Sequence, residues 1–519
     1  MPPAKIDHAG LDALFAPFGR TDAPGYAVGV ALPGAQPYRR GFGMANIELP
    51  VALSPTIRMR IGSTTKHFTA LAILLLAEEG CLSLDDSPRA HLSELPDWAD
   101  AITLRQLLSH TSGMRDSLDL VLHSAGPGKT LPDDYQLRTL AALDDVNFAP
   151  GTSWNYNNGG YVLASEIVAR LSGQSFADFM GERIFAPIGM HDTLVRPLDT
   201  DLLPNSATLH VPRPGGGYDR GVFGAPIGGE GGIVSTVDDM LRWLRHMDAP
   251  FVGSTSSWAA IRTPLTTHGY GLGLFIDRHR GVERLNHAGA VVGGSSQMVK
   301  IPAHGLDIVI MSNGCPSLDG YRLADAIIDL CIPGLAPAPP HIDAPAVIGD
   351  FHSQESGRLL RLGEQDGAQT ITIGAFTLPA RRDDSGALSL PFLPTDMRAT
   401  VSANGDHLDI EEYGRTDSLL RLPTTCAIAE ESIAGHYNSR AASLTAIIRQ
   451  KDGNALEMVF NGPLGSTAYL LHPLADRLWE AKATSTLPLV ATLEFDDSGF
   501  RLTTGRTTRL PFLRVESGA

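Results

Sequence analysis

Ser63 and Lys66 are three positions apart, just before a strongly apolar stretch at 68–77. Residues three apart on a helix share a face, so the hydroxyl and the amine are expected to stand one above the other. A serine becomes a useful nucleophile only when a base removes its proton, and a lysine can be that base where burial favours the neutral amine. The pair therefore predicts covalent catalysis by Ser63. Because Ser-x-x-Lys also occurs by chance, the prediction depends on supporting residues elsewhere.

A second group of candidate residues lies in the Gly/Asn-rich segment around Tyr156 and Asn158, directly before a helix predicted over 160–171. A tyrosine on such a loop can point its phenol into a cleft and relay a proton to the leaving group. Considered alone, the segment is typical of a turn with a half-buried aromatic residue. Its assignment to proton transfer therefore depends on the other motifs.

The third group is the run His287-Ala288-Gly289-Ala290, which follows charged turn residues and indicates the end of a strand. Small residues there let a substrate backbone approach closely. The backbone N–H of Ala290 and that of Ser63, at a helix start, could together hold the oxyanion of an acyl-transfer intermediate. His287 would then orient or polarise the substrate, although a lone histidine is more often structural.

In the order Ser-x-x-Lys, Tyr-x-Asn and His-x-Gly, the three groups resemble the motifs of the penicillin-recognising serine hydrolases. That family includes class C β-lactamases, D-Ala-D-Ala carboxypeptidases, family VIII esterases and D-aminopeptidases. The flanking stretches 107–114, 187–190, 231–236 and 270–273 are similar to family segments as well. Within the first of them, His110 is expected to shape the cleft wall. The likeness covers about residues 10 to 330.

The resemblance implies that Ser63 is the nucleophile and that Lys66 and Tyr156 activate it. It implies a role in substrate binding for four further residues: Asn158, His287, Gly289 and Ala290. It implies neither a cofactor nor a metal ion.

Helical patterns alternate with short Gly-bounded apolar runs over the first 332 residues. The stretch 68–77 predicts a buried helix that ends at Gly80, and 160–171 and 236–247 predict two more helices. Two strands are expected, at 26–32 and 306–311. The mixture predicts an α/β (α+β) catalytic domain, with an antiparallel sheet flanked by helices. The resemblance identifies this fold as β-lactamase/transpeptidase-like.

The Pro-rich segment 333–345 predicts a linker after this catalytic domain, 1–332. Beyond the linker, short alternating strands divided by turn residues are typical of all-β structure. We expect two antiparallel β-domains there, 346–428 and 429–519, and the resemblance to the D-stereospecific aminopeptidases of this family implies that both are β-barrel domains.

The β-rich tail also contains an internal repeat. Gly349-Asp350-Phe351-His352-Ser353 recurs as Gly435-His436-Tyr437-Asn438-Ser439, and Gly414-Arg415-Thr416 recurs as Gly505-Arg506-Thr507. The two matches keep their order and have nearly the same offset. They predict that the two β-domains are related by duplication.

A catalytic domain followed by two β-domains is similar to the architecture of the D-stereospecific aminopeptidases of this family. We therefore expect hydrolysis of amide bonds in small peptides or amino-acid amides. In those enzymes a carboxylate of the third domain helps to hold the substrate amine, and the corresponding stretch here, 480–488, offers only Glu480. Three alternatives stay open: a carboxylesterase, a D-Ala-D-Ala carboxypeptidase or linear peptidase, and a penicillin-binding protein that is acylated without turnover.

The net charge of −16, without any basic stripe, argues against a nucleic-acid partner. No apolar run approaches the ~18 residues that a membrane span requires, and the first residues show no signal-peptide pattern. These features predict a cytoplasmic protein without a membrane partner. Four dispersed cysteines indicate reduced thiols. The expected partner is a small peptide, amino-acid amide or ester substrate, and a homodimer is left open.

Overall fold

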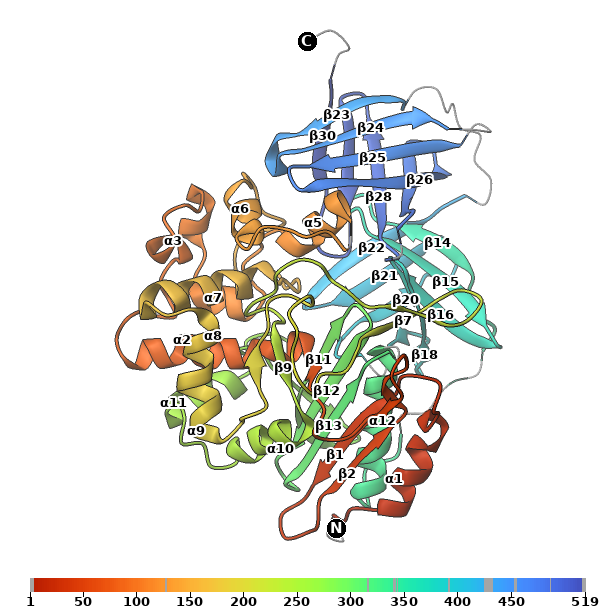
Figure 1. Ribbon diagram of the computed structural model, residues 1–519. Coiled ribbons are helices and arrows are strands. Elements are labelled where there is room, and N and C mark those ends of the chain that lie inside the picture. Colours follow the sequence, from red (N-terminus) through yellow and green to blue (C-terminus); the bar gives the residue numbers. More distant parts are fainter. Residues whose placement is uncertain are drawn as a thin grey trace. The chain divides into compact units, whose positions relative to one another are not determined.

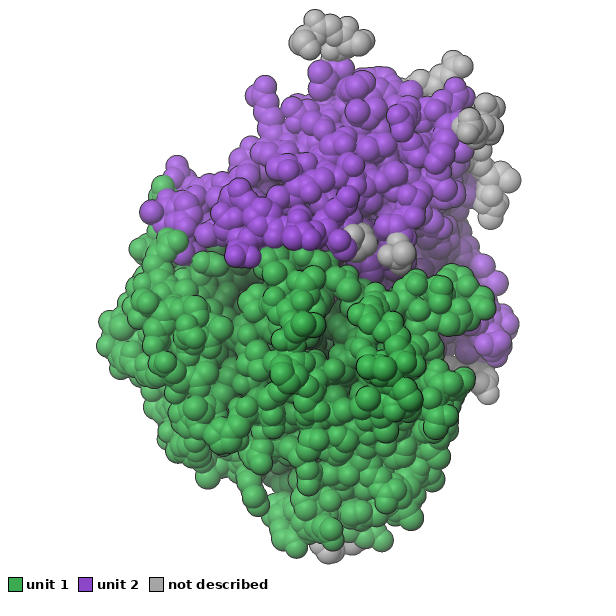
Figure 2. Space-filling model, in the orientation of Figure 1, with its two compact units in different colours: residues 1–91, 103–109, 160–338 green, residues 92–102, 110–159, 339–519 purple. Residues whose placement is uncertain are grey.

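The computed structural model describes residues 4–126, 128–314, 317–338, 342, 344–390, 393–423, 433–451, 455–485 and 487–515 (Figure 1). The chain divides into two compact units, which Figure 2 colours separately. Unit 1 consists of residues 1–91, 103–109 and 160–338, and unit 2 consists of residues 92–102, 110–159 and 339–519. The predicted catalytic domain thus contributes residues to both units.

Unit 1 is built on a six-stranded antiparallel sheet. Its strands follow the order β10 (Phe275–His279), β11 (Val282–Val291), β12 (Gly294–Ile301), β13 (Leu306–Ser312), β1 (Tyr26–Ala31) and β2 (Tyr38–Phe42). The strands predicted at 26–32 and 306–311 are confirmed, and they are neighbours, with Tyr26 opposite Ser312. All residues of β12 and β13 are buried.

Helices cover both faces of this sheet (Figure 1). On one face α1 (His8–Phe15) and α12 (Ser317–Cys331) pack against alternate residues of the strands in one hydrophobic core. On the other face lies α10 (Val237–His246), the helix predicted at 236–247. Gly29 permits that approach, because a Cβ at this position would lie 2.5 Å from Val237 Cγ1.

The apolar stretch 68–77 forms part of α2 (Lys66–Glu78), in which every residue from Lys66 to Leu76 is buried. The chain leaves α2 at Gly80, whose φ of +73° is the left-handed conformation that glycine adopts at low cost. The predicted buried helix and its end are confirmed. The helix predicted at 160–171 is α7 (Gly159–Ser172).

Shorter elements complete unit 1. The helices are α3 (Pro88–His91), α4 (Leu104–Leu108), α8 (Phe176–Met180), α9 (Ala186–Ile188) and α11 (Thr255–Arg262). The strands are β3 (Met44–Asn46), β4 (Val51–Ala52), β5 (Met59–Arg60), β6 (Leu194–Val195), β7 (His210–Pro212), β8 (Tyr218–Arg220) and β9 (Ile233–Ser235).

The first β-structure of unit 2 is a nine-stranded antiparallel sheet in the order β17-β16-β15-β14-β22-β21-β20-β19-β18. Its strands are β14 (Gly349–His352), β15 (Leu359–Gln365), β16 (Ala368–Ile373), β17 (Phe376–Pro379), β18 (Arg381–Arg382), β19 (Leu388–Ser389), β20 (Arg398–Val401), β21 (His407–Glu412) and β22 (Arg415–Arg421). The two end strands, β17 and β18, are separated in the chain by Ala380 alone. The sheet is therefore a nearly closed barrel.

The second β-structure is a closed barrel of eight strands, drawn in blue in Figure 1. Its strands are β23 (Gly435–Ser439), β24 (Leu444–Gln450), β25 (Leu456–Gly462), β26 (Gly465–Ala475), β27 (Leu478–Ala483), β28 (Val490–Asp496), β29 (Gly499–Thr503) and β30 (Leu510–Val515). Pairing of β23 with β30 closes it, so each of the eight described strands has a neighbour on both sides. The strands of the two β-structures fall within 346–428 and 429–519, while the domain boundaries themselves stay a prediction.

The sequence repeat has a structural counterpart. The first copy of the longer motif covers β14 and the second copy covers β23, each the first strand of its sheet. Both strands pair with the last strand of the same sheet, β22 and β30 respectively. The two Gly-Arg-Thr copies begin in the turns that precede those last strands. Similar short sequences at the same topological positions support a duplication.

Unit 2 also contains two helices from the first third of the chain, α5 (Ser117–Ala125) and α6 (Tyr135–Ala141). Helix α5 packs on β25 and β26 of the closed barrel. None of the described helices combines the length and apolar character that crossing a membrane requires. Cys81 and Cys331 are free thiols, whereas Cys315 and Cys426 lie outside the described residues, as do linker positions 339–341 and 343.

Candidate active site

Ser63 and Lys66 lie together in unit 1, as predicted. Ser63 belongs to a 3₁₀ turn, Gly62–Thr65, that leads directly into α2, and Lys66 is the first residue of α2. Lys66 Nζ is 3.1 Å from Ser63 Oγ. Ser63 is partly exposed and Lys66 is fully buried. The amine is thus at hydrogen-bonding distance from the hydroxyl, which the predicted proton transfer requires.

Two groups of unit 1 hold the Lys66 amine in place. Nζ donates a hydrogen bond of 2.7 Å to the backbone oxygen of Glu230, and it lies 5.4 Å from the centre of the Tyr161 ring. The Tyr161 ring is fixed in turn, since its hydroxyl donates to Leu108 O at 2.6 Å. Burial opposes the charged form of a lysine, whereas a carbonyl acceptor and an aromatic face favour it. The two contacts therefore fix the position of the amine beside Ser63.

Strand β11 brings the His-x-Gly motif against the 3₁₀ turn. A Cβ on Gly289 would lie 1.8 Å from Ile61 O, so only glycine fits here. Side chains of β12, the neighbour of β11, and of the 3₁₀ turn add two hydrogen bonds. Ser296 Oγ donates to Ile61 O at 2.7 Å, and Thr64 Oγ1 donates to His287 O at 3.2 Å. The glycine of the motif therefore sets the distance between β11 and the turn that contains Ser63.

The proposed oxyanion donors come from these two adjoining segments. Gly62, with φ +50°, directly precedes Ser63, and a Cβ on it would lie 2.8 Å from Ala290 N. The N–H of Ser63 is in the first turn of a helix, where amides lack an intrahelical acceptor. Backbone amides from two fixed segments are suited to stabilise a developing oxyanion without reorganisation.

His287 is buried in β11 and is a neutral imidazole. Its Nδ1 lies 2.6 Å from Ala288 O, and because a carbonyl only accepts, Nδ1 carries the hydrogen. Nε2 can then accept from the Tyr270 hydroxyl at 3.3 Å. Burial, followed by the positive charge of Lys66, lowers the pKa of His287 to about 3. His287 is thus suited to hydrogen bonding and orientation, and unsuited to act as a cation near neutral pH.

Tyr156 and Asn158 lie in unit 2, on the loop that precedes α7. His110 holds this loop: its Nδ1 accepts from Asn157 N at 3.1 Å, and its ring centre is 4.3 Å from that of Tyr156. Asn157 Nδ2 also donates to Met114 O at 2.7 Å. His110 therefore holds this loop in place, in keeping with the structural role expected for it.

Asn158 is oriented by a carboxylate that the sequence analysis did not single out. Its backbone N and its Nδ2 both donate to Asp116 Oδ2, at 2.9 and 3.1 Å. Asp116 is fully buried and also caps α5, accepting from Leu118 N at 2.9 Å. Aspartate is a common residue at the N-cap of a helix, and Asp116 directly precedes Ser117, the first residue of α5. This is the one feature of the sequence that pointed to Asp116.

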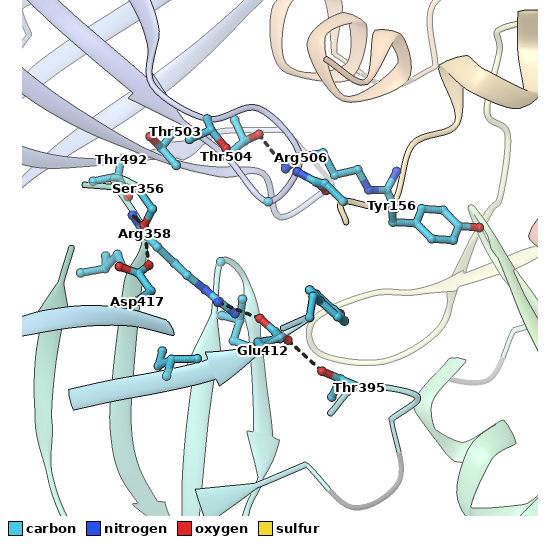
Figure 3. Close-up of a pocket in the computed structure, with 18 of the residues that line it drawn as sticks. Tyr156, Ser356, Arg358, Thr395, Glu412, Asp417, Thr492, Thr503, Thr504 and Arg506 are labelled. Carbon is cyan, nitrogen blue, oxygen red and sulfur yellow. Dashed lines mark hydrogen bonds and ion pairs between the residues drawn. The ribbon is translucent and has the colours of Figure 1, made fainter. Parts of the chain in front are cut away.

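A cavity of about 750 Å³ lies within unit 2 (Figure 3). Its lining comes from the tyrosine loop, the nine-stranded sheet and the closed barrel, and includes Tyr156, Arg358, Glu412, Glu480 and Arg506. Arg358 pairs with Glu412 at 2.7 Å. In Figure 3 the phenol oxygen of Tyr156 points away from this ion pair. The lining of the cavity thus combines an aromatic residue with charged residues, most of which form ion pairs.

Glu480, predicted to contact the substrate amine, lies in β27 and lines this cavity. Its side chain is almost fully buried, and both oxygens have cationic partners, Arg361 at 2.6 Å and Lys482 at 3.0 Å. Burial raises the pKa of Glu480, but the two cations outweigh it and hold the pKa below its usual range. Its carboxylate is thus ionised, and its role toward substrate stays a prediction.

The predicted site residues divide between the two units. Unit 1 brings together Ser63, Lys66, His287, Gly289 and Ala290, whereas unit 2 holds Tyr156, Asn158 and Glu480. The sequence analysis missed the groups that hold them: Glu230 O and Tyr161 on Lys66, Tyr270 on His287, and Asp116 and Arg506 in unit 2. Tyr270 lies in the stretch 270–273, which is similar to a family segment, and this similarity was the only sequence feature that pointed to it.

Known proteins are similar to most of this chain. Residues 11–331 match the family model described as Beta-lactamase. A D-aminopeptidase of Brucella melitensis biotype 2 is 28% identical over 88% of this chain and 87% of its own length. A D-aminopeptidase of Gluconobacter oxydans is 26% identical over 96% of this chain and 95% of its own length.

Solved structures share the fold. An octameric penicillin-binding protein homologue from Pyrococcus abyssi covers 97% of this chain and 99% of that chain, with a TM-score of 0.56 and 20% identity. A D-amino acid amidase from Ochrobactrum anthropi SV3 covers 62% of this chain and 97% of that chain, with a TM-score of 0.54 and 23% identity. These likenesses confirm the predicted fold class.

Proposed function

Because this chain belongs to the Beta-lactamase family, we propose that it is a serine hydrolase of the D-aminopeptidase type. Its substrates would be small peptides or amino-acid amides that carry a D-residue at the N-terminus. The observation that carries the proposal is the pair of Ser63 Oγ and Lys66 Nζ, 3.1 Å apart at the start of a buried helix. D-aminopeptidases similar over nearly the whole chain support the substrate class.

The proposed reaction has two steps through an acyl-enzyme. Lys66 takes the proton of Ser63, whose oxygen attacks the amide carbonyl, and the N–H groups of Ser63 and Ala290 hold the resulting oxyanion. The C–N bond then breaks as the leaving amine receives a proton, which the motif order assigns to Tyr156. Water hydrolyses the ester by the reverse proton path and releases the amino acid. The roles of Asn158, His287 and Gly289 are to bind and orient the substrate.

We propose that no metal ion takes part, since backbone amides are assigned the task of stabilising the oxyanion. Activity should therefore survive prolonged dialysis against a chelator. Loss of activity that a divalent ion restores would contradict this assignment.

Glu480 is proposed as the carboxylate that recognises the substrate amine. Its ionised state and its place in the wall of a cavity that Tyr156 also lines support this role. Glu480→Gln should raise KM for D-alanine p-nitroanilide and leave KM for its N-acetyl analogue unchanged. An equal change in KM for both substrates would show that Glu480 does not recognise the amine and acts only through its ion pairs with Arg361 and Lys482.

The substrate class is tested with D- and L-alanine p-nitroanilides, p-nitrophenyl esters and a chromogenic cephalosporin, each with wild type and Ser63→Ala. We expect turnover of the D-anilide above the L-anilide, and none in the variant. Ester hydrolysis without D-anilide hydrolysis would instead identify a carboxylesterase. Stoichiometric acylation by the cephalosporin without turnover of any substrate would identify a penicillin-binding protein.

A further inference from the structure

The two Gly-Arg-Thr copies of the repeat share a contact that the duplication alone does not require. In the first copy the Arg415 guanidinium lies 5.7 Å from the centre of the Phe148 ring. In the second copy the Arg506 guanidinium lies 5.1 Å from the centre of the Tyr156 ring. Both aromatic residues belong to the segment 147–158, the tyrosine segment. An arginine over an aromatic face is attracted by the ring quadrupole, more strongly where water is excluded.

Arg506 makes a second contact that reaches the motif asparagine. Its Nη1 is 3.2 Å from Asp116 Oδ2, the same oxygen that accepts both hydrogen bonds from Asn158. Asp116 is fully buried, so its charge is tolerable only with a cation beside it. Burial lowers the pKa of Arg506, but the charge of Asp116 outweighs this and the pKa is raised. Arg506 therefore stays charged and links Asn158 to Tyr156.

The rest of the loop 504–508 is bonded to the same region. The Oγ1 atoms of Thr504 and Thr507 both donate to Asp119 Oδ2 in α5, at 2.5 and 2.9 Å. Asn147 is bonded through both ends of its amide. Its Nδ2 donates to Arg506 O, and its Oδ1 accepts from Thr508 N, at 2.8 and 2.9 Å. Hydrogen bonds from the loop 504–508 thus connect the start of α5 to the start of the tyrosine segment.

The other end of α5 rests on the β25–β26 hairpin of the same barrel. Gly465 fits closely there, with Ala125 Cα 3.3 Å from where its Cβ would stand. Tyr469 donates its hydroxyl to His123 O at 2.8 Å. Both ends of α5 are therefore fixed to the closed barrel, and the loop 504–508 has a rigid base.

We infer that the repeated Gly-Arg-Thr turns are a clamp for the tyrosine segment, and that Arg506 with Asp116 positions Tyr156 and Asn158 for catalysis. Arg415 supports the same segment from the nine-stranded sheet, through Phe148 and through Thr152 Oγ1 at 3.3 Å. Arg506 and Asp116 are positioning residues. The inference rests on the proposed function, because it takes Tyr156 as a group of the reaction.

The test compares Arg506→Met, Asp116→Asn and the double variant with wild type, in the full-length chain. We expect each single change to lower kcat for D-alanine p-nitroanilide about tenfold or more. KM should stay within about twofold in Arg506→Met, which leaves Asp116 as the acceptor of both hydrogen bonds from Asn158, and should rise in Asp116→Asn, which weakens them. The double variant should be no worse than the poorer single variant, because both changes break one contact. Arg506→Lys should recover part of kcat, since it keeps the charge beside Asp116.

A second measurement does not depend on activity. Hydrogen exchange followed by mass spectrometry should show faster exchange in peptides from 147–158 in Arg506→Met. Thr507→Val is a milder variant of similar shape, which removes one hydrogen bond to Asp119 and should give a smaller effect of the same kind. Arg501→Met is the matched control: Arg501 lies in the same barrel with only a 3.6 Å contact to Asp496, and its loss should change neither measurement.

The outcomes separate the inference from the proposed function. If wild type does not hydrolyse the D-anilide, the proposed function fails, and the exchange data alone then decide whether the clamp exists. Unchanged kcat in Arg506→Met, unchanged exchange in 147–158, or losses that add in the double variant would each overturn the inference.

Discussion

The backbone of Gly289 passes so close to Ile61 that an added Cβ would stand 1.8 Å from the Ile61 carbonyl oxygen. This contact joins the strand of the His-x-Gly motif to the turn that contains Ser63. A glycine in this motif is thus a spacing element: it fixes how near Ala290 N comes to the residues around Ser63.

Gly289→Ala should therefore push β11 away from the 3₁₀ turn. We expect a loss of roughly 1–3 kcal/mol in the free energy of unfolding, the usual cost of overpacking, and a slower acylation of Ser63. Chemical denaturation and stopped-flow acylation with a reactive ester measure the two effects. Gly320→Ala is the control, because a Cβ there meets only Gln297 Cβ at 3.6 Å. Acylation at the wild-type rate in Gly289→Ala would refute the spacing role.

Ser63 should form a covalent acyl-enzyme. Intact mass measured after brief exposure to a reactive ester or a β-lactam should show one adduct in wild type and none in Ser63→Ala. Peptide mapping should place the adduct in the peptide that contains 61–66. An adduct of the same mass in the variant would assign the nucleophile elsewhere.

Lys66 and Tyr156 should behave as one proton-transfer unit. Each of Lys66→Met and Tyr156→Phe should lower kcat by on the order of 10²–10⁴, the usual contribution of a general acid or base. The double variant should lose little more, since groups that act together are not additive. Lys66→Arg should not restore activity, because a guanidinium stays protonated. Multiplied losses would indicate independent roles.

His287 should make the protein sensitive to mild acid. Its pKa is about 3 in the folded protein and near 6.5 in the unfolded chain, so between these values only the unfolded state takes up the proton. The resulting stability is fully present above pH 6.5 and is lost as the pH falls toward 3. It amounts to on the order of 5 kcal/mol.

Urea unfolding at several pH values tests this with the neutral variant His287→Gln. The stability difference between wild type and His287→Gln should shrink as the pH falls from 7 to 4. His191→Gln, at an exposed position, serves as the control for replacing a histidine. A difference independent of pH would show that His287 is not held neutral by burial.

Much of this fold follows from short-range pattern. The apolar run 68–77 and Gly80 determine where α2 lies and ends, because burial and the left-handed conformation of glycine are local requirements. The strands at 26–32 and 306–311 could also be predicted, because a short apolar run is a local feature of the sequence. Spacing within a motif is also local, so Ser63 and Lys66 could be paired from sequence and are found 3.1 Å apart.

The supporting contacts could not be predicted, because they join single polar residues far apart in the chain. Thr504 meets Asp119 and Arg506 meets Asp116 across nearly four hundred positions, with no periodicity to signal either pair. The contact between Tyr270 and His287 could not be predicted either, although the two residues are near in sequence. It depends on how the chain turns between them. Membership of residues 110–159 in unit 2 follows from such contacts and was not foreseen.

The pairing of β1 with β13 has a consequence for how the protein is made. Tyr26 emerges from the ribosome early, yet its partner Ser312 is synthesised only after most of unit 1 has been translated. At 5–20 residues per second, one edge of β1 waits for tens of seconds without a neighbour. During that interval a newly made, largely apolar strand is open to pairing with other chains. The yield of soluble protein should therefore respond to translation speed and to chaperones that shield nascent strands.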